Sequence, residues 1–556
     1  VPSGELQRTV ADDAQHTLPN FRQGDAIVLY ERNADTDNVT NKMVFKGNID
    51  YLNENEICIR LRATQQNSSV LPSDSLYAIE HDAMDTTFRS MYQGLYAFMS
   101  ATKERRDLLL SQREPQFDVA LDKQIAEAAD DFTRIALKAK AAKDYFLLVG
   151  PPGTGKTSCA LKKMVETFYK EEGAQILLLS YTNRAVDEIC KALSSIRPEV
   201  DFIRVGSELS CDENYRDHLI ENELATCMRR TEVCERINRC RILVGTVASI
   251  SGKPELFRLK HFDVAIVDEA TQILEPQLLG ILCAKGENGK EGVGKFILIG
   301  DHKQLPAVVL QNTEQSEVYD EALSAVGLKN LKDSLFERLY RTARQHTDAH
   351  RTYDMLCRQG RMHPEVALFA NQAFYEGRLL PVGLPHQLED SGNINRLSFY
   401  PSRPEPMGSS AKTNHSEAKI AARLAATVYK EHSEAFDASR TLGIITPYRS
   451  QIALIKKEIE VLGISELNQI LIDTVERFQG SERDVIIYSF CVNYPYQLKF
   501  LSNLTEEDGI LIDRKLNVAL TRARKQMLLT GVPTLLERNP LYKSLLKLIE
   551  SLRNIA

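Results

Sequence analysis

Apolar residues are grouped along the chain into short, nearly continuous runs, each followed by a polar turn and a segment with helical periodicity. Such runs are typical of strands buried on both faces of a parallel sheet that helices cover. The first series of runs lies at 145–150, 175–181, 240–246, 263–269 and 295–301. A second series follows at 352–359, 441–448, 471–478, 484–490 and 525–531. The pattern predicts an α/β protein with two such domains in series, over 115–345 and 346–556.

The residues before the first series show two other patterns. Over 21–79, short segments of alternating apolar and polar residues are broken by Gly, Asn and Asp, which indicates a small antiparallel sheet or barrel. Over 85–114, apolar residues recur at helical spacing, and only the isolated Gly94 weakens the pattern. We expect a β-barrel accessory domain over 1–82 and a helical stalk over 83–114.

Composition narrows the class of protein. The 556 residues are 43% hydrophobic and 26% charged, as in ordinary globular chains. The formal net charge of −7 excludes a general basic field, so any binding to nucleic acid must be local. The apolar runs are too short to cross a bilayer, and no signal peptide or CxxC pair is present. We expect an intracellular protein that does not bind membranes; the start at Val1 indicates a piece of a longer or processed protein.

A glycine-rich loop follows the first buried run and precedes a helical segment. Its backbone N–H groups suit phosphate oxygens, Lys156 suits the β- and γ-phosphates, and Thr157 suits Mg²⁺. The predicted nucleotide-binding residues are Gly150, Pro151, Pro152, Gly153, Thr154, Gly155, Lys156 and Thr157.

Two later runs end in polar residues that suit the same phosphates. Asp268 ends one run and is predicted to complete the magnesium site with Thr157. Glu269 comes next and is predicted to activate water as a general base. Asp301 and Gln304 follow the next run, and Gln304 is predicted to bond the γ-phosphate or the water.

A set of motifs occurs in the order found in superfamily-one helicases. The motifs are GPPGTGKT, SYTNRAVDE, VGTVAS, VDEATQ, GDHKQLPAV, SLFERL, QGRMHPEV, ITPYRSQ, DTVERFQGSERD and LNVALTRARKQ. The chain resembles the class B members, in the branch that contains the nonsense-mediated mRNA decay helicase and the replication helicase-nuclease. The resemblance spans about residues 144–532 and implies two RecA-like P-loop domains, ATP and Mg²⁺ as cofactors, and 5′ to 3′ movement on single-stranded DNA or RNA.

The resemblance also assigns residues in the second domain. Arg361 and Arg522 match arginines that reach the γ-phosphate, where a guanidinium stabilises the transferring phosphoryl group. Glu482 matches a glutamate that contacts the ribose. Two departures concern the adenine: Gly360 stands where the family usually has a stacking tyrosine, and Gln124 lies further upstream of the phosphate loop than the family's base-reading glutamine.

Nucleic acid is expected across the tops of both α/β domains. Hydroxyls and amides at strand ends suit phosphate contacts that position a strand without reading its sequence. The resemblance points to Thr182, Asn183, Thr246, Thr446, Arg449 and Thr474. His363 precedes Pro364 and is expected to pack or cap a helix rather than bind a metal.

These observations favour an ATP-dependent helicase or translocase, and we expect it to act as a monomeric motor. The alternatives are a nucleic-acid-stimulated ATPase that clamps or remodels nucleoprotein without unwinding, a small-molecule kinase, and a binding module with an inactive nucleotide site. A kinase would not need the second domain, and an inactive site would not need Lys156, Asp268 and Glu269 together. The resemblance also allows a nuclease or other domain before Val1.

Overall fold

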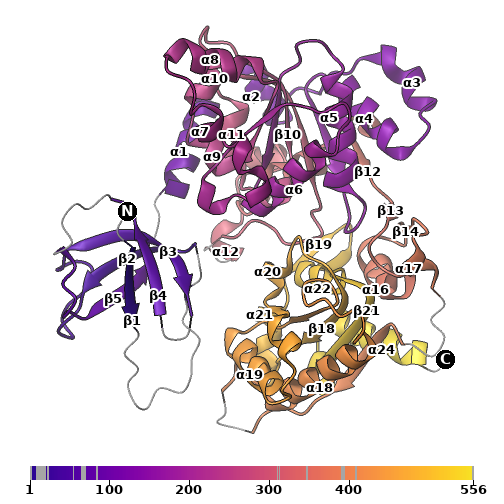
Figure 1. Ribbon diagram of the computed structural model, residues 1–556. Coiled ribbons are helices and arrows are strands. Elements are labelled where there is room, and N and C mark those ends of the chain that lie inside the picture. Colours follow the sequence, from indigo (N-terminus) through magenta and orange to yellow (C-terminus); the bar gives the residue numbers. More distant parts are fainter. Residues whose placement is uncertain are drawn as a thin grey trace. The chain divides into compact units, whose positions relative to one another are not determined.

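The computed structural model describes residues 3–7, 21, 24–53, 56–63, 70–82, 86–309, 311, 313–345, 348–389, 395–406 and 410–553. The chain forms two compact units, Val1–Arg89 and Ser90–Ala556, and each is described by itself (Figure 1). Among the described residues, no helix combines the length and the apolar character that a membrane crossing requires.

The N-terminal unit contains a five-stranded antiparallel sheet, in the order β1-β4-β3-β2-β5. Its strands are β1 Ser3–Gln7, β2 Ala26–Glu31, β3 Val44–Leu52, β4 Glu56–Leu61 and β5 Tyr77–His81. Alternate residues of β2 and β3, among them Ile27, Leu29 and Ile49, are buried in one small core. The predicted antiparallel sheet is confirmed, whereas closure into a barrel stays a prediction because β1 and β5 are not paired in the described part of the unit.

The predicted stalk is two helices rather than one, α1 Thr86–Met99 and α2 Lys103–Leu109. The break arises because the Thr102 hydroxyl accepts a hydrogen bond from the Arg105 N–H at 3.3 Å and thereby caps a new helix. Gly94 allows α1 to approach helix α11 (Glu275–Leu282) closely: a Cβ on Gly94 would lie 1.9 Å from the Pro276 carbonyl oxygen. The isolated glycine is thus a contact point and not a helix break.

The first α/β domain is built on a seven-stranded parallel sheet, in the order β12-β6-β11-β10-β7-β9-β8. The strands are β6 Tyr145–Val149, β7 Ile176–Ser180, β8 Phe202–Val205, β9 Ile242–Thr246, β10 Phe262–Val267, β11 Val293–Gly300 and β12 Tyr353–Met355. The remaining helices are α3 Asp122–Ala126, α4 Asp131–Ala141, α5 Lys162–Tyr169, α6 Asn183–Ser194, α7 Ile220–Glu223, α8 Arg230–Arg239, α9 Val247–Ser251, α10 Glu255–Leu259, α12 Thr313–Ser316, α13 Glu321–Ala325, α14 Leu335–Ala343 and α15 Ala349–Thr352.

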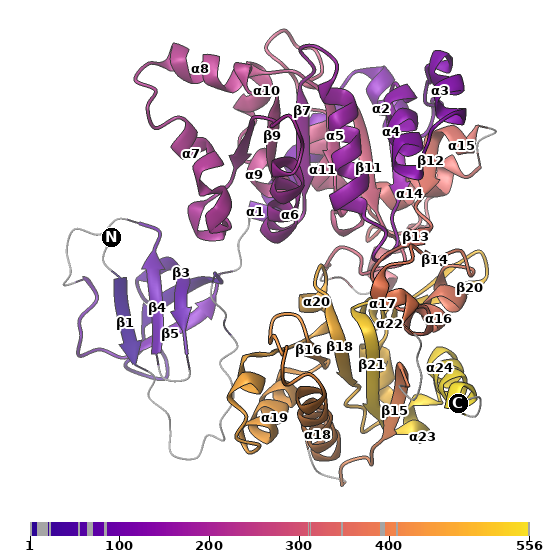
Figure 2. The ribbon, with the colours of Figure 1, turned by 45° about the vertical axis from the view of Figure 1, so that its right-hand side comes forward.

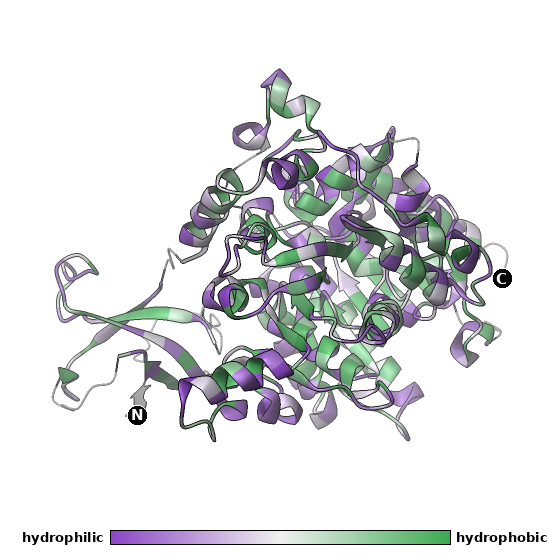
Figure 3. Ribbon diagram, turned by 90° about the horizontal axis from the view of Figure 1, so that it is seen from above, coloured by the Kyte–Doolittle hydropathy of each residue, from purple (hydrophilic) through white to green (hydrophobic). Residues whose placement is uncertain are grey.

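Helices cover both faces of this sheet, as the apolar runs predict. Alternate residues of β6 enter two different cores: Leu147 packs with α9, α11 and α14, and Leu148 packs with α4, α5 and α6. Figure 2 shows helices on the two sides of the strands, and the hydropathy colours of Figure 3 show green strands in the interior beside helices that carry both colours.

The second α/β domain has a five-stranded parallel sheet, in the order β15-β21-β18-β16-β17. The strands are β15 Leu397–Pro401, β16 Leu442–Ile445, β17 Leu471–Asp473, β18 Arg483–Ser489 and β21 Ala523–Gly531, with the small pairs β13 Arg358–Gln359 and β14 Leu380–Pro381, and β19 Leu504–Glu507 and β20 Ile510–Asp513. The helices are α16 Pro364–Phe374, α17 Pro385–Leu388, α18 His415–Glu431, α19 Arg449–Glu460, α20 Val475–Phe478, α21 Leu498–Leu501, α22 Arg514–Leu520, α23 Pro533–Leu536 and α24 Pro540–Arg553.

Three strands differ from the sequence prediction. Residues 353–355 were assigned to the second domain, but β12 pairs with β6 at the edge of the first sheet. The strands β8 and β15 were missed; β15 is an edge strand whose sequence, LSFYP, interrupts its apolar residues with Ser and Pro. The first sheet therefore includes a strand from beyond the predicted boundary at 345.

The expected cap is confirmed: His363 Nδ1 accepts from the Glu365 N–H at 3.2 Å where α16 begins.

Candidate nucleotide and nucleic-acid sites

Three polar segments meet at one edge of the first sheet. The phosphate loop (150–157) follows β6, Asp268 and Glu269 follow β10, and Asp301 to Gln304 follow β11. Since β6, β11 and β10 are neighbours in the parallel sheet, their carboxyl ends lie side by side. The fold thus brings together residues that the sequence separates widely, at the edge where α/β proteins bind ligands.

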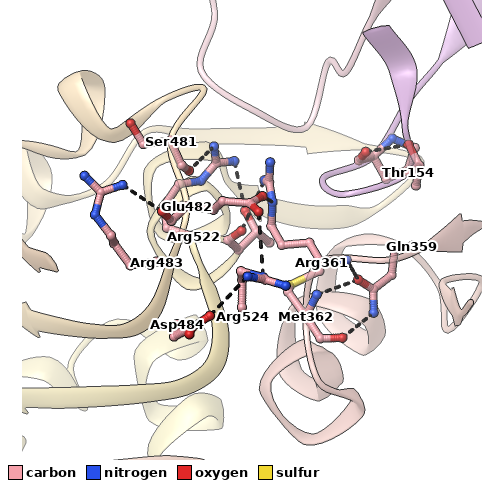
Figure 4. Close-up of polar contacts among 12 residues, drawn as sticks. Thr154, Gln359, Arg361, Met362, Ser481, Glu482, Arg483, Asp484, Arg522 and Arg524 are labelled. Atoms are coloured by element: carbon pink, nitrogen blue, oxygen red, sulfur yellow. Dashed lines mark hydrogen bonds and ion pairs between the residues drawn. The ribbon is translucent and has the colours of Figure 1, made fainter. Parts of the chain in front are cut away.

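The phosphate loop has the backbone that a phosphate cradle needs. Gly153 and Gly155 have φ of 73° and 77°, in the left-handed region that glycine adopts without strain. The Thr154 hydroxyl donates to the Pro151 carbonyl at 2.7 Å and fixes the turn (Figure 4). The loop then leads into the π-helical turn Lys156–Leu161, whose first N–H groups belong to the cradle.

Thr157 and Asp268 form a donor set that fits Mg²⁺. The Thr157 hydroxyl donates to Asp268 Oδ2 at 2.5 Å, so a hydroxyl and a carboxylate from two elements already meet. Burial, followed by the nearby Glu269 carboxylate, raises the pKa of Asp268. A divalent cation would favour the charged form of this carboxylate, and hard oxygen donors are the ligands that Mg²⁺ prefers. These two residues would hold the ion, which would neutralise phosphate charge.

Glu269 stands beside this donor set in an unusual conformation. Its φ of 53° lies in the left-handed region, a feature that is concentrated at functional sites in proteins. One carboxylate oxygen lies 3.7 Å from Lys156 Nζ, and the other accepts from Gln272 Nε2 at 3.0 Å. Its side chain is 22% exposed, so water reaches a carboxylate that two neighbours hold in place.

Gln304 links the two α/β domains. Its Nε2 donates to Asp301 Oδ2 at 2.9 Å, and its Oε1 accepts from Arg522 Nη2 at 3.2 Å. Arg522 is 2% exposed, and burial, with the nearby Arg361 guanidinium next in importance, lowers the pKa of Arg522 to about 9. An anion bound among these groups would stabilise the charged form of Arg522 and raise its pKa again.

Arg361 approaches the phosphate loop from the second domain. A Cβ on Gly153 would lie 2.4 Å from Arg361 Cβ, and the Gly360 N–H donates to the Gly153 carbonyl at 2.8 Å. The Arg361 side chain donates from Nε to Glu482 Oε2 at 2.6 Å (Figure 4). Both predicted arginine fingers therefore lie at the phosphate edge, as expected, although Arg361 is held by a carboxylate.

Glu482 has a different partner from the predicted ribose. It accepts from Arg361, and Arg524 Nε lies 3.7 Å from its other oxygen. Burial raises the pKa of Glu482, but Arg361 and then Arg524 outweigh that effect and keep the pKa below its ordinary value. The ribose contact stays a prediction, since two guanidinium groups engage this carboxylate here.

The two positions where the sequence departs from the family differ in their surroundings. Gly360 has no left-handed φ, and a Cβ there would lie 3.1 Å from Leu384 Cδ1 and 3.8 Å from Val382 Cγ2. Gln124 is exposed in α3. The partly buried ring of Phe132 is next to the loop instead, 3.6 Å from the position of a Cβ on Gly155.

The predicted nucleic-acid residues occupy equivalent places in the two domains. Thr182 follows β7 and Thr246 is the last residue of its neighbour β9, while Thr446 and Thr474 follow the neighbouring strands β16 and β17. Thr182 caps α6, which begins at Asn183, and Thr246 caps α9, with hydroxyls that accept at 3.2 and 3.0 Å. Helix N-termini suit phosphates.

The side chains of these residues differ in exposure. Thr182 is exposed, and Asn183, Arg449 and Thr474 are half-buried. Thr446 is fully buried, and its hydroxyl has no hydrogen-bond partner within the described ranges. A phosphate contact through the Thr446 hydroxyl would therefore require this segment to open.

A buried hydrogen-bond network behind Asp301 was not predicted from the sequence. The Tyr375 hydroxyl donates to Asp301 Oδ2 at 2.7 Å and accepts from Asn517 Nδ2 at 2.8 Å. Asn517 also donates to the Lys303 carbonyl at 2.7 Å, so this network joins the two domains. The only signal in the sequence was that Asn517 precedes the arginine motif of Arg522 within one helical segment.

Comparisons with known proteins agree with this two-domain arrangement. One family model described as "AAA domain" matches residues 126–233 and 222–312, and a second with the same description matches 331–534. The DNA replication ATP-dependent helicase/nuclease DNA2 of Bos taurus is 27% identical over 590 residues, covering 96% of this chain and 50% of that protein. Its namesake from Xenopus laevis is 29% identical over 531 residues, covering 87% of this chain and 46% of that protein.

The chain spans about half the length of these curated relatives. A solved structure of an arterivirus nonstructural protein 10 helicase with DNA is 13% identical, with a TM-score of 0.39, and covers 96% of this chain and 78% of that chain.

Proposed function

Because the chain belongs to the superfamily-one helicases, with both AAA domains and a distant relationship to the helicase/nucleases, we propose that it is an ATP-driven motor on single-stranded nucleic acid. The phosphate loop holds ATP, Glu269 activates the attacking water, and Arg361 and Arg522 stabilise charge on the transferring phosphoryl group. Hydrolysis then removes the γ-phosphate that both domains share. The two α/β domains then separate, and the motor advances by one step along the strand in the 5′ to 3′ direction.

The hydrogen bond between Gln304 and Arg522 is the observation that best supports this proposal. It joins the polar residues after β11 in one domain to the arginine of the other, with Glu269 and Lys156 at the same edge. A kinase would hold its phosphates within one domain, whereas here residues of two domains meet beside the phosphate loop. Nucleotide state and domain closure are therefore coupled.

We further propose single-stranded DNA as the preferred strand. The relatives are named for DNA replication, and the expected contacts are hydroxyls and helix N-termini that bind phosphates. Such contacts do not read the base, so the choice between DNA and RNA must come from contacts near the sugar.

Steady-state ATPase assays with length-matched DNA and RNA oligonucleotides test the proposal. We expect a severalfold increase in the hydrolysis rate with single-stranded DNA and a smaller one with RNA. Lys156→Ala is the control, because it removes the phosphate-binding ammonium group and should abolish hydrolysis with either strand. A rate that neither strand changes would refute the motor. A forked duplex then distinguishes unwinding from a clamp that hydrolyses ATP without separating strands.

Loose base selectivity is a second expectation for this site. Without a ring at Gly360, the adenine loses a stacking contact of about 0.5–1.5 kcal/mol. Phosphate contacts do not depend on the base, so kcat/KM for GTP or CTP should lie within roughly tenfold of that for ATP, since about 1.4 kcal/mol corresponds to one decade. Gly360→Tyr should tighten ATP binding, because the backbone is not left-handed and only the flexible end of Leu384 is close.

Measurement of kcat/KM for the four ribonucleotides, with saturating single-stranded DNA, checks this expectation. A preference for ATP above about a hundredfold, or 2.8 kcal/mol, would show that another group reads the adenine. Phe132→Ala would then be the informative variant, because that ring lies beside the phosphate loop.

A further inference from the structure

Three aromatic residues lie within one short segment that follows β18. Tyr496 is 54% exposed and Phe500 is 64% exposed, and the ring of Tyr494 stacks on that of Tyr496 with centroids 5.8 Å apart and planes 12° apart. We call Tyr494, Tyr496 and Phe500 the aromatic patch. Adjacent exposed aromatic side chains are uncommon on soluble proteins and usually mark a binding surface.

The buried side chain of Gln497 fixes the backbone of the segment that carries the patch. Gln497 is 2% exposed, and its Oε1 accepts from the N–H groups of Asn493 and Tyr494, both at 2.9 Å. Its Nε2 donates to the Ala411 carbonyl at 2.6 Å and to the Tyr448 hydroxyl at 3.2 Å. These bonds fix the backbone of the segment that carries the rings, which reduces the conformational entropy that this segment would lose on binding a ligand.

The patch lies between two segments that the proposed function assigns to the nucleic acid. On one side, Gln497 bonds Tyr448, which directly precedes Arg449. On the other side, Lys515 Nζ donates to the Phe500 carbonyl at 3.3 Å and lies 3.1 Å from Glu476, close after Thr474. Helix α21 carries Phe500, and helix α20 begins after Thr474; both are labelled in Figure 1.

The charge around the patch suits a polyanion. The exposed Lys499 lies within the same segment, Arg449 follows the Tyr448 that Gln497 bonds, and the Glu476 carboxylate is paired with Lys515. Aromatic rings between cationic groups and helix N-termini are the combination that binds single strands without sequence preference, because every base has a face that can stack.

We propose that the aromatic patch is a base-stacking platform for single-stranded nucleic acid, with Tyr496 as its principal ring. This inference rests on the proposed function, since it extends the expected phosphate contacts of Arg449 and Thr474 to the bases. The phosphates position the strand, and stacking on Tyr496 holds one base out of the solvent. The patch thus adds affinity for single strands that paired bases within a duplex do not gain.

Substitution of Tyr496 in the full chain tests the platform, with oligothymidylate and an abasic oligonucleotide of equal length as probes. We expect Tyr496→Ala to weaken binding of oligothymidylate on the order of tenfold, the scale of one lost base stack, and to leave binding of the abasic strand unchanged. Tyr496→Phe, which keeps the ring, should bind like the unaltered protein. An equal loss for both probes would assign Tyr496 a structural role and overturn the platform.

A second readout uses the absence of tryptophan from the chain. In Tyr496→Trp, the single indole should be quenched by oligothymidylate and not by the abasic strand. If oligothymidylate stimulates ATP hydrolysis but leaves the indole unquenched, the platform is overturned and the motor stands. If oligothymidylate neither binds nor stimulates the unaltered chain, the proposed function fails and the platform with it.

Discussion

Arg522→Ala should lower the rate of ATP hydrolysis on the order of 10³-fold while ATP affinity changes only severalfold, because an arginine finger acts mainly in the transition state. The guanidinium is 2% exposed and bonded to Gln304 across the domains. Burial and then Arg361 lower its pKa to about 9 and outweigh the nearby carboxylates, so a bound phosphate would stabilise its charged form. Arg361→Ala should have a similar effect, because Arg361 lies against Gly153 of the phosphate loop.

Single-turnover hydrolysis and binding of a nucleotide analogue measure the two effects separately. Arg423→Ala is a matched control: this exposed arginine on α18 of the same domain bonds the Lys419 carbonyl of its own helix at 3.2 Å and is expected to leave hydrolysis within a few-fold of normal. Arg522 also donates to the carbonyls of Val518 and Ser481, so the unfolding temperature of each variant must be compared with that of the unaltered chain. A folded Arg522 variant with normal turnover would remove this arginine from the mechanism.

Glu269→Gln should lower hydrolysis by at least about 10²-fold, the usual effect of losing a general base, and leave binding of ATP and single-stranded DNA intact. The amide has the shape of the carboxylate, so the contact with Gln272 at 3.0 Å can persist while proton abstraction is lost. The left-handed backbone at this position stays as it is, since the substitution changes only the end of the side chain.

Pre-steady-state phosphate release, with filter binding of ATP and DNA in parallel, checks this result. Glu255→Gln is the control, because Glu255 is an exposed carboxylate on α10 of the same domain. Turnover of Glu269→Gln within a few-fold of the unaltered chain would exclude Glu269 as the base. Loss of ATP binding would instead indicate that its 3.7 Å contact with Lys156 maintains the phosphate loop.

The sequence predicted those parts of the fold that local patterns determine. Runs such as Phe262–Val267 are apolar at nearly every position, because a parallel strand between two helical layers has no exposed face. The edge strands β12 and β15 carry weaker patterns and were misplaced or missed. Their positions depend on long-range pairing, which a local pattern does not contain.

The candidate site shows the same division. Motif order identified Lys156, Glu269 and Arg522, and the fold brings them to one edge as expected. The pairing of Arg361 with Glu482 was not predicted, because it forms between residues far apart in the chain, and neither motif specifies its partner. The burial of Thr446 was not predicted either, since a threonine after a strand has the same sequence signature whether it is covered or open.

The contact of Gly94 with Pro276 ties the stalk helix α1 closely to helix α11. Helix α11 begins soon after Glu269, and its first turn presses backbone against backbone on α1. Such a contact contains no side chain that could change rotamer and absorb a movement. A displacement of α11 must therefore move the part of α1 around Gly94 with it, because neither backbone has room to yield.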